Sequence, residues 1–186
     1  MKKRLALLCA AATCLLVVAP SAAVASSDIQ TFELEMEVPN VAQAPNGDMV
    51  AVTGHGEFSV HPKSVEASGN FTHTDSEGNV IGAGTWEATQ LLSYQSYGCG
   101  VVPSIGVTLP PNFCGGALKM GVVFMPAGTT LAIPGIMTVF CVIGPQAPPP
   151  HDNPTEQGEE GTVAVIPGVA NFNKIVSGMN VYIQTP

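Results

Sequence analysis

The segment from Met49 to Tyr94 alternates apolar and polar residues and is interrupted repeatedly by glycine. A period of two sends successive side chains to opposite faces of a β-strand, so that one face can be buried while the other meets solvent. After Ser26, no 11-residue window combines a 3.6-residue apolar period with an absence of Gly and Pro. The pattern therefore predicts an all-β chain.

Three strands joined by two turns are predicted in this segment, over Met49–Val60, Val65–Thr74 and Val80–Tyr94. In the first hairpin we expect Phe58 to lie opposite Ala67. In the second we expect Phe71 opposite Gly84 and Trp86 opposite Gly69.

This pairing separates a core face from a solvent face. The expected core face comprises Val50, Val52, Phe58, Val60, Val65, Ala67, Phe71, His73, Val80 and Trp86. The expected solvent face comprises Thr53, His55, Glu57, Ser59, Glu66, Ser68, Asn70, Thr72, Thr85, Glu87 and Thr89. Glycines on the core face leave room for large rings and permit strong coiling, which favours a single antiparallel β-barrel of about eight strands.

Other segments supply the remaining strands. Gln30–Glu37 alternates three apolar residues with Glu33, Glu35 and Glu37, as is typical of a charged edge strand. Four or five further strands are expected within Ala117–Met125, Thr130–Ile143, Gly161–Ile166 and Lys174–Gln184. The Gly- and Pro-rich stretch after Tyr97 is expected to form a long loop.

The first 25 residues have the features of a secretory signal peptide. A basic start, Lys2-Lys3-Arg4, precedes an apolar run from Leu5 to Val18 and the small-x-small sequence Ala23-Val24-Ala25. The run is too short for a stop-transfer helix, and no later segment is long enough to span a bilayer as a helix. We therefore expect a signal peptide at 1–25, one secreted or extracytoplasmic domain at 26–186, and no integral membrane segment after cleavage.

Three cysteines, Cys99, Cys114 and Cys141, remain after cleavage and allow three pairings. Cys99 and Cys114 both lie in glycine-containing loop sequence, where the backbone can meet disulfide geometry, so we expect them to pair. Cys141 lies in an apolar run with no adjacent histidine or cation, so it is expected to be a small buried hydrophobe.

The charge of the mature chain limits its partners. Three lysines, no arginine and 14 acidic residues give residues 26–186 a formal net charge of −11. Nucleic acid and anionic lipid are therefore poor candidates for partners. Residues 144–161 form a Pro-rich acidic stretch without a basic residue, expected to be an extended, solvated loop.

The chain lacks the familiar hydrolase, zinc-protease, phosphate-binding and EF-hand motifs. His73, expected on the core face, is a candidate acid, base or ligand-orienting group, although a hydrogen-bonded structural histidine is the commoner case. His55, Glu57 and Glu87 share the outer face and could hold a divalent cation, but an ordinary polar face is expected there. No metal or other cofactor is predicted.

Thr53-Gly54-His55-Gly56-Glu57-Phe58, followed by Ala67-Ser68-Gly69, resembles a stretch of the dirigent and allene oxide cyclase-like barrels. Gly84-Thr85-Trp86 is similar to a motif of lipocalins and avidins. The resemblance implies a β-barrel with an interior pocket for apolar or phenolic molecules. No active-site residue of those families finds a matching motif in this chain.

Three functions remain open. The first is a non-catalytic binding or interaction module for a small apolar or aromatic molecule, with His73, Trp86 and Phe71 in the pocket and Tyr94 at its mouth. The second is a cyclase or isomerase of the allene oxide cyclase or dirigent type that uses His73 as acid or base. The third is a structural surface protein with a filled interior, which would present its acidic faces and proline-rich loop to a partner. Filling of the interior by Phe58, Phe71 and Trp86 would favour the third.

Overall fold

The computed structural model describes residues 30–149 and 160–186, which form strands without any helix. The predicted signal peptide and residues 150–159 of the acidic loop lie outside the described residues. Across residues 30–149 and 160–186, no helix is long and apolar enough to cross a membrane. The strands are β1 (Thr31–Gln43), β2 (Met49–Ser59), β3 (Ser64–Thr74), β4 (Val80–Cys99), β5 (Val101–Val102), β6 (Val107–Thr108), β7 (Phe113–Pro126), β8 (Ile133–Cys141), β9 (Gly161–Ile166), β10 (Ala170–Phe172) and β11 (Lys174–Thr185).

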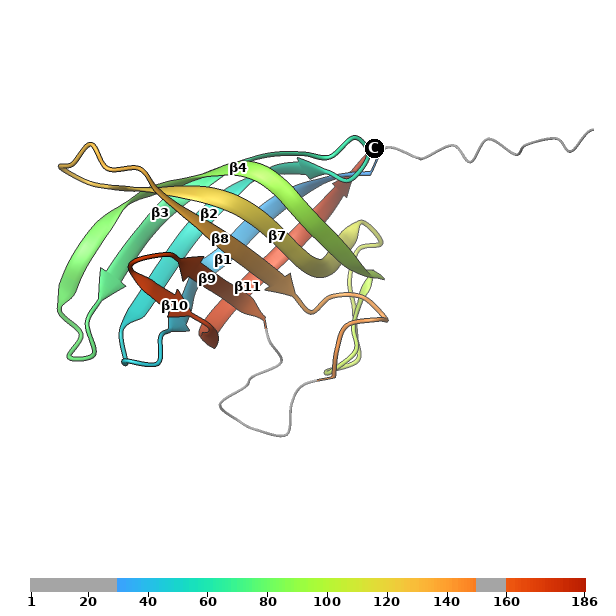
Figure 1. Ribbon diagram of the computed structural model, residues 1–186. Helices are drawn as coiled ribbons and strands as arrows, with labels where there is room; N and C mark the ends of the chain where they lie inside the picture. The colour runs from blue at the N-terminus through green and yellow to red at the C-terminus, as the bar shows by residue number, and fades with distance from the viewer. Residues whose placement is uncertain (1–29, 150–159) are drawn as a thin grey trace, which may run out of the picture.

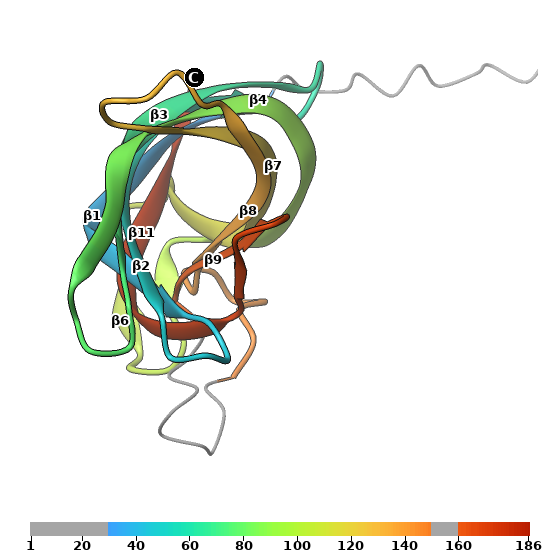
Figure 2. The same cartoon turned by 60° about the vertical axis from the view of Figure 1, so that its left-hand side comes forward.

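Nine of the strands form one antiparallel sheet in the order β10-β9-β8-β7-β11-β1-β2-β3-β4. A further pairing of β4 with β7 closes six of them, β7, β11, β1, β2, β3 and β4, into a ring. The strands wrap around a common axis (Figures 1 and 2). Strands β8, β9 and β10 extend the sheet beyond β7, and β9 packs back against β1 and β11. The prediction of an all-β, antiparallel chain is thus confirmed.

The second predicted hairpin is confirmed residue by residue, since Phe71 lies opposite Gly84 and Trp86 opposite Gly69. The register predicted for the first hairpin is wrong by two residues, because Phe58 lies opposite Val65. The turn begins at Val60, whose amide donates to the carbonyl of Gln30 beside β1. A shift of two residues preserves the faces but changes every cross-strand partner.

The expected core face is largely confirmed. Its buried members are Val50, Val52, Phe58, Ala67, Phe71 and Trp86. Val60, Val65 and His73 are half-buried. Val80 departs from the prediction, because it begins β4 next to the β3–β4 turn and is 65% exposed. Ser59, expected on the solvent face, is buried.

Strand β1 is not an edge strand, contrary to the sequence prediction. It pairs with β2 on one side and with β11 on the other, although β11 comes from the far end of the chain. A pairing so remote in sequence leaves no local signal in either segment. The acidic alternation of Glu33 and Glu35 therefore lies within the sheet, where edge protection does not explain it.

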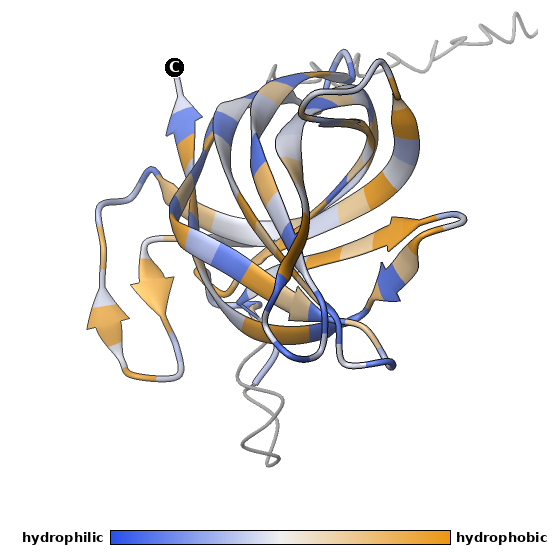
Figure 3. Cartoon of the chain, turned by 90° about the vertical axis from the view of Figure 1, so that its left-hand side faces the viewer, coloured by the Kyte–Doolittle hydropathy of each residue, from blue (hydrophilic) through white to orange (hydrophobic). Residues whose placement is uncertain are grey.

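The predicted disulfide joins Cys99 at the end of β4 to Cys114 near the start of β7. The two residues are direct partners in the β4–β7 ladder, so the bridge fastens the closure of the ring. It also encloses the small β5–β6 hairpin, whose apolar strands stand away from the sheet (Figure 3). Cys141 is buried, as expected, and burial raises the pKa of its thiol to about 12.

A buried pair of amide side chains joins β9 to the ring. Asn40 of β1 and Asn180 of β11 exchange hydrogen bonds of 3.0 Å, and both are at most 2% exposed. Asn180 also donates to the carbonyl of Phe140, at the end of β8, and to that of Gly161, at the start of β9. These side chains supply partners for polar groups that the backbone ladder does not reach.

Glu160, which precedes β9, completes this junction. Its Oε1 accepts the backbone N–H of Asn180 at 2.8 Å. Burial of the carboxylate raises the pKa of Glu160, against the opposing effect of this hydrogen bond. The folded state therefore binds the Glu160 proton more tightly than the unfolded state does.

This raised pKa predicts the pH dependence of a Glu160→Gln variant. The contribution of Glu160 to stability is full below its ordinary value of 4.5 and is lost as the pH rises through the folded value. Glutamine keeps an acceptor for Asn180 and does not titrate, so the variant should be more stable than wild type at pH 7. The difference should vanish near pH 4.

Urea unfolding of both proteins at pH 4, 5.5 and 7 measures this difference. An advantage of the glutamine variant that stays constant with pH, or a loss of stability at pH 7, would contradict the expectation.

Candidate functional site

Trp86 lies inside the six-stranded ring. Its indole side chain is fully buried, and the indole Nε1 donates to the Thr53 carbonyl of β2 at 2.9 Å. The indole lies against the backbone of Gly54, where a Cβ atom would collide with it and with the Ser68 carbonyl. Gly54 lies directly opposite Gly69 of β3, so two strands lack side chains where Trp86 needs the space.

Phe71 lies next to Trp86 along the β3–β4 register. It packs edge to face against Phe124 of β7, with 5.3 Å between ring centroids. Its side chain is 9% exposed and Phe124 is 1% exposed. Two of the predicted pocket residues are therefore adjacent, and both contribute to a packed core.

Tyr94 belongs to a second aromatic cluster further along β4. Its ring contacts Phe32, Phe58 and Tyr182, with centroid distances of 4.9 to 5.7 Å. The Tyr94 hydroxyl donates to the Gly115 carbonyl at 3.1 Å, and burial raises its pKa. This side chain is therefore a neutral donor within the core beside the disulfide-linked end.

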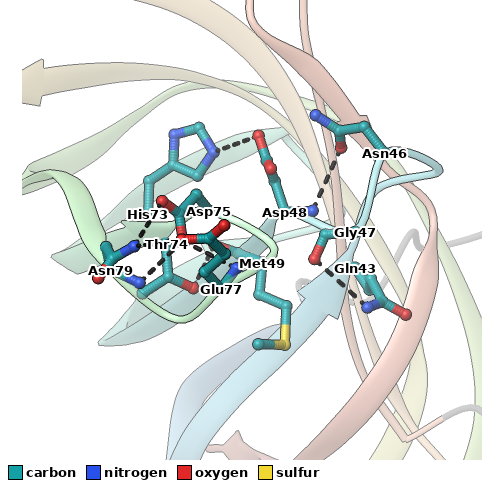
Figure 4. Close-up of polar contacts among 10 residues, drawn as sticks. All are labelled: Gln43, Asn46, Gly47, Asp48, Met49, His73, Thr74, Asp75, Glu77 and Asn79. Atoms are coloured by element: carbon teal, nitrogen blue, oxygen red, sulfur yellow. Dashed lines mark hydrogen bonds and ion pairs between the residues drawn. The ribbon is translucent and has the colours of Figure 1, made fainter.

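His73 lies at the opposite end of the interior. Its Nε2 is 3.4 Å from Oδ2 of Asp48, in the β1–β2 turn, and its ring packs edge to face on Phe172 of β10 at 5.2 Å. Figure 4 shows the imidazole and the Asp48 carboxylate turned toward each other above the β3–β4 turn. Through these contacts His73 holds a turn and the last strand of the sheet against β3.

The four predicted ligand residues thus occupy three places. Phe71 and Trp86 lie together, whereas Tyr94 and His73 lie toward opposite ends. The interior between them is occupied by packed rings, including Phe58, which is 1% exposed. Their role in binding a ligand stays a prediction.

The outer face of the same strands carries a row of three glutamates. Glu33 of β1 lies opposite Glu57 of β2, which lies opposite Glu66 of β3. Side chains directly opposite one another in an antiparallel pair have Cβ atoms roughly 4.5–5.5 Å apart, and like charges there are destabilising. All three side chains are exposed.

A second row lies beside the first and crosses four strands. Glu35 lies opposite His55, His55 opposite Ser68, and Ser68 opposite Glu87 of β4. We call the two rows together the acidic face. It comprises Glu33, Glu57, Glu66, Glu35, His55, Ser68 and Glu87.

Two grooves follow these rows. One lies between the two rows of the acidic face, over Gly56 and Ala67. The other lies between the second row and the neighbouring Thr53, Asn70 and Thr85, over Gly54 and Gly69. Besides these small residues, the first groove is lined by Val65 and Ala88 and the second by Met36 and Trp86. The longer polar side chains of the neighbouring rows form the walls.

No lysine lines either groove. Lys63 donates to the Leu92 carbonyl and Lys174 to the Gln43 side chain, while Lys119 lies opposite Ser93 on β4. Within residues 30–149 and 160–186, no three His, Cys, Asp or Glu side chains are placed to hold a metal ion. The carboxylates of the acidic face are instead distributed along its two rows across β1–β4.

The sequence prediction missed the first row. The register expected for the first hairpin placed Ser68, not Glu66, opposite Glu57, and no pairing partner was predicted for the strand that contains Glu33. The signal that could have found the row was the position of the turn, since starting it at Val60 brings Glu57 opposite Glu66.

Comparisons of this chain with protein-family models, curated proteins and solved structures find no match. The resemblance to dirigent and allene oxide cyclase-like barrels therefore stays a prediction, as does the cyclase or isomerase activity that it would imply.

The contact between Gly54 and Trp86 predicts the effect of a single methyl group. Gly54→Ala should force the ring or the strand to move and lower the free energy of unfolding by about 1–3 kcal/mol. Trp86 is the only tryptophan of the chain, so its fluorescence reports the unfolding directly.

Gly82→Ala is the matched control, because a Cβ there has its nearest neighbour at an ordinary 3.7 Å, the Cβ of His73. Equal stability of the two variants would show that the Gly54 contact does not limit the packing of Trp86.

Proposed function

We propose that this protein is a secreted, non-catalytic interaction module that binds an extended cationic partner, such as a lysine-rich peptide segment, across its acidic face. The observation that carries the proposal is the row of directly opposed glutamates, Glu33, Glu57 and Glu66. The disulfide between Cys99 and Cys114 is compatible with secretion, because such bridges persist outside reducing compartments.

The free-energy cost of the row supports a role in binding. Each directly opposed pair of like charges costs about 0.2–1 kcal/mol of stability. The groove walls contain no lysine that would offset this cost. A partner that brings ammonium or guanidinium groups to the row would remove this repulsion. The binding free energy would then include the relief of a strain already present in the free protein.

The shape of the surface supports an extended partner. The grooves run across β1–β4 between rows of side chains, so they can receive a chain whose side chains point into them. The carboxylates are spread along two rows and do not converge on one point, which suits several separated cationic groups. Electrostatic complementarity of this kind gives specificity and fast association.

The filled interior supports an outward-facing function. Trp86, Phe58 and Phe71 take up the space in which a small ligand would lie, and each makes defined contacts there. The surface beyond this core is where the charged side chains are gathered.

Replacing two opposed glutamates tests the proposal. A Glu57→Gln/Glu66→Gln variant should bind an octalysine peptide about tenfold or more weakly than wild type, because each carboxylate–ammonium contact at 4 Å is worth about 1 kcal/mol in water. The same variant should gain stability, since an opposed like-charge pair is removed. Calorimetric titration at low salt and urea unfolding measure the two effects.

The matched control is Glu37→Gln/Glu77→Gln, which makes the same change of net charge at exposed positions outside the acidic face. Equal weakening by both double variants would attribute binding to net charge alone and would contradict a site on the acidic face. Absence of octalysine binding by wild type would also overturn the proposal.

A further inference from the structure

We propose that His55 is a pH-sensitive charge switch within the acidic face, which weakens the binding of a cationic partner when the pH falls from 7.5 to 5.5. This inference rests on the proposed function, because it assigns regulation to the same surface. Histidine is the one ordinary side chain that changes its charge between pH 5 and 8.

The position of His55 in the register carries the inference. It lies directly between Glu35 of β1 and Ser68 of β3, and it is exposed on the outer face. It contributes to the walls of both grooves. A partner lying in either groove would therefore pass the imidazole.

The groups around His55 are all acidic or neutral. Glu33 and Glu66 lie diagonally across from it, Glu57 is two residues further along β2, and Glu87 lies two strands away beyond Ser68. Together with Glu35, these are the charged groups that the neighbouring strands present to it. Among the residues that line the grooves, His55 alone can become a cation.

Protonation would place a positive charge where the partner places its own. Repulsion between two unit charges roughly 6 Å apart in water corresponds to about a threefold change in a dissociation constant. Glutamate carboxylates stay ionised and lysine ammonium groups stay protonated between pH 5.5 and 7.5, since their ordinary pKa values are about 4.3 and 10.4. The effect is therefore attributable to a histidine.

The experiment measures octalysine binding at pH 7.5 and 5.5, at one fixed low salt concentration. Wild type should bind about threefold more weakly at pH 5.5. His55→Gln should bind equally at the two pH values. His55→Lys should bind as weakly at pH 7.5 as wild type does at pH 5.5.

His61→Gln is the matched control, because His61 is exposed in the β2–β3 turn and lines neither groove. It should keep the wild-type pH dependence. An unchanged pH dependence in His55→Gln would overturn the switch while leaving the acidic face as the binding surface. No binding by wild type at pH 7.5 would overturn the proposed function and the switch together.

Discussion

The packing of Trp86 against the backbone of Gly54 is the contact on which the rest of the arrangement depends. The absence of side chains at Gly54 and Gly69 lets β2 and β3 approach closely and leaves space for the indole ring inside. The same two residues form the floor of a groove outside. The absence of side chains at Gly54 and Gly69 thus makes room for Trp86 in the interior and forms part of a groove on the outer face.

The inner and outer faces consequently have different chemistry on the same strands. Alternation places Phe58 inward and Glu57 outward on β2, and similarly Ala67 inward and Glu66 outward on β3. Because β1 is held between β2 and β11, its glutamates are brought into the same rows. The resulting surface concentrates negative charge, and no lysine lines either of its grooves. This surface gives the proposed function its partner chemistry.

The sequence was sufficient for features that depend on neighbouring residues. The alternation, the second hairpin and the Cys99–Cys114 bridge all follow from local spacing and turn composition, and the structure confirms them. It was insufficient for the place of β1, since β11 lies at the other end of the chain, and for the first hairpin, whose turn starts one residue earlier than expected. The row containing Glu33, Glu57 and Glu66 depends on the β1–β2 pairing, for which no register was predicted, and on the first hairpin. It therefore became evident only in the folded chain.

A nuclear magnetic resonance titration of ¹⁵N-labelled mature protein with octalysine would distinguish binding on the acidic face from binding elsewhere. We expect amide shifts to concentrate on the acidic face, around His55, Glu57 and Glu66, while the amides of Phe124 and Tyr182, which line neither groove, stay unchanged. Shifts that spread over the whole surface, or that appear at Phe124 and Tyr182, would contradict a binding site on the outer face.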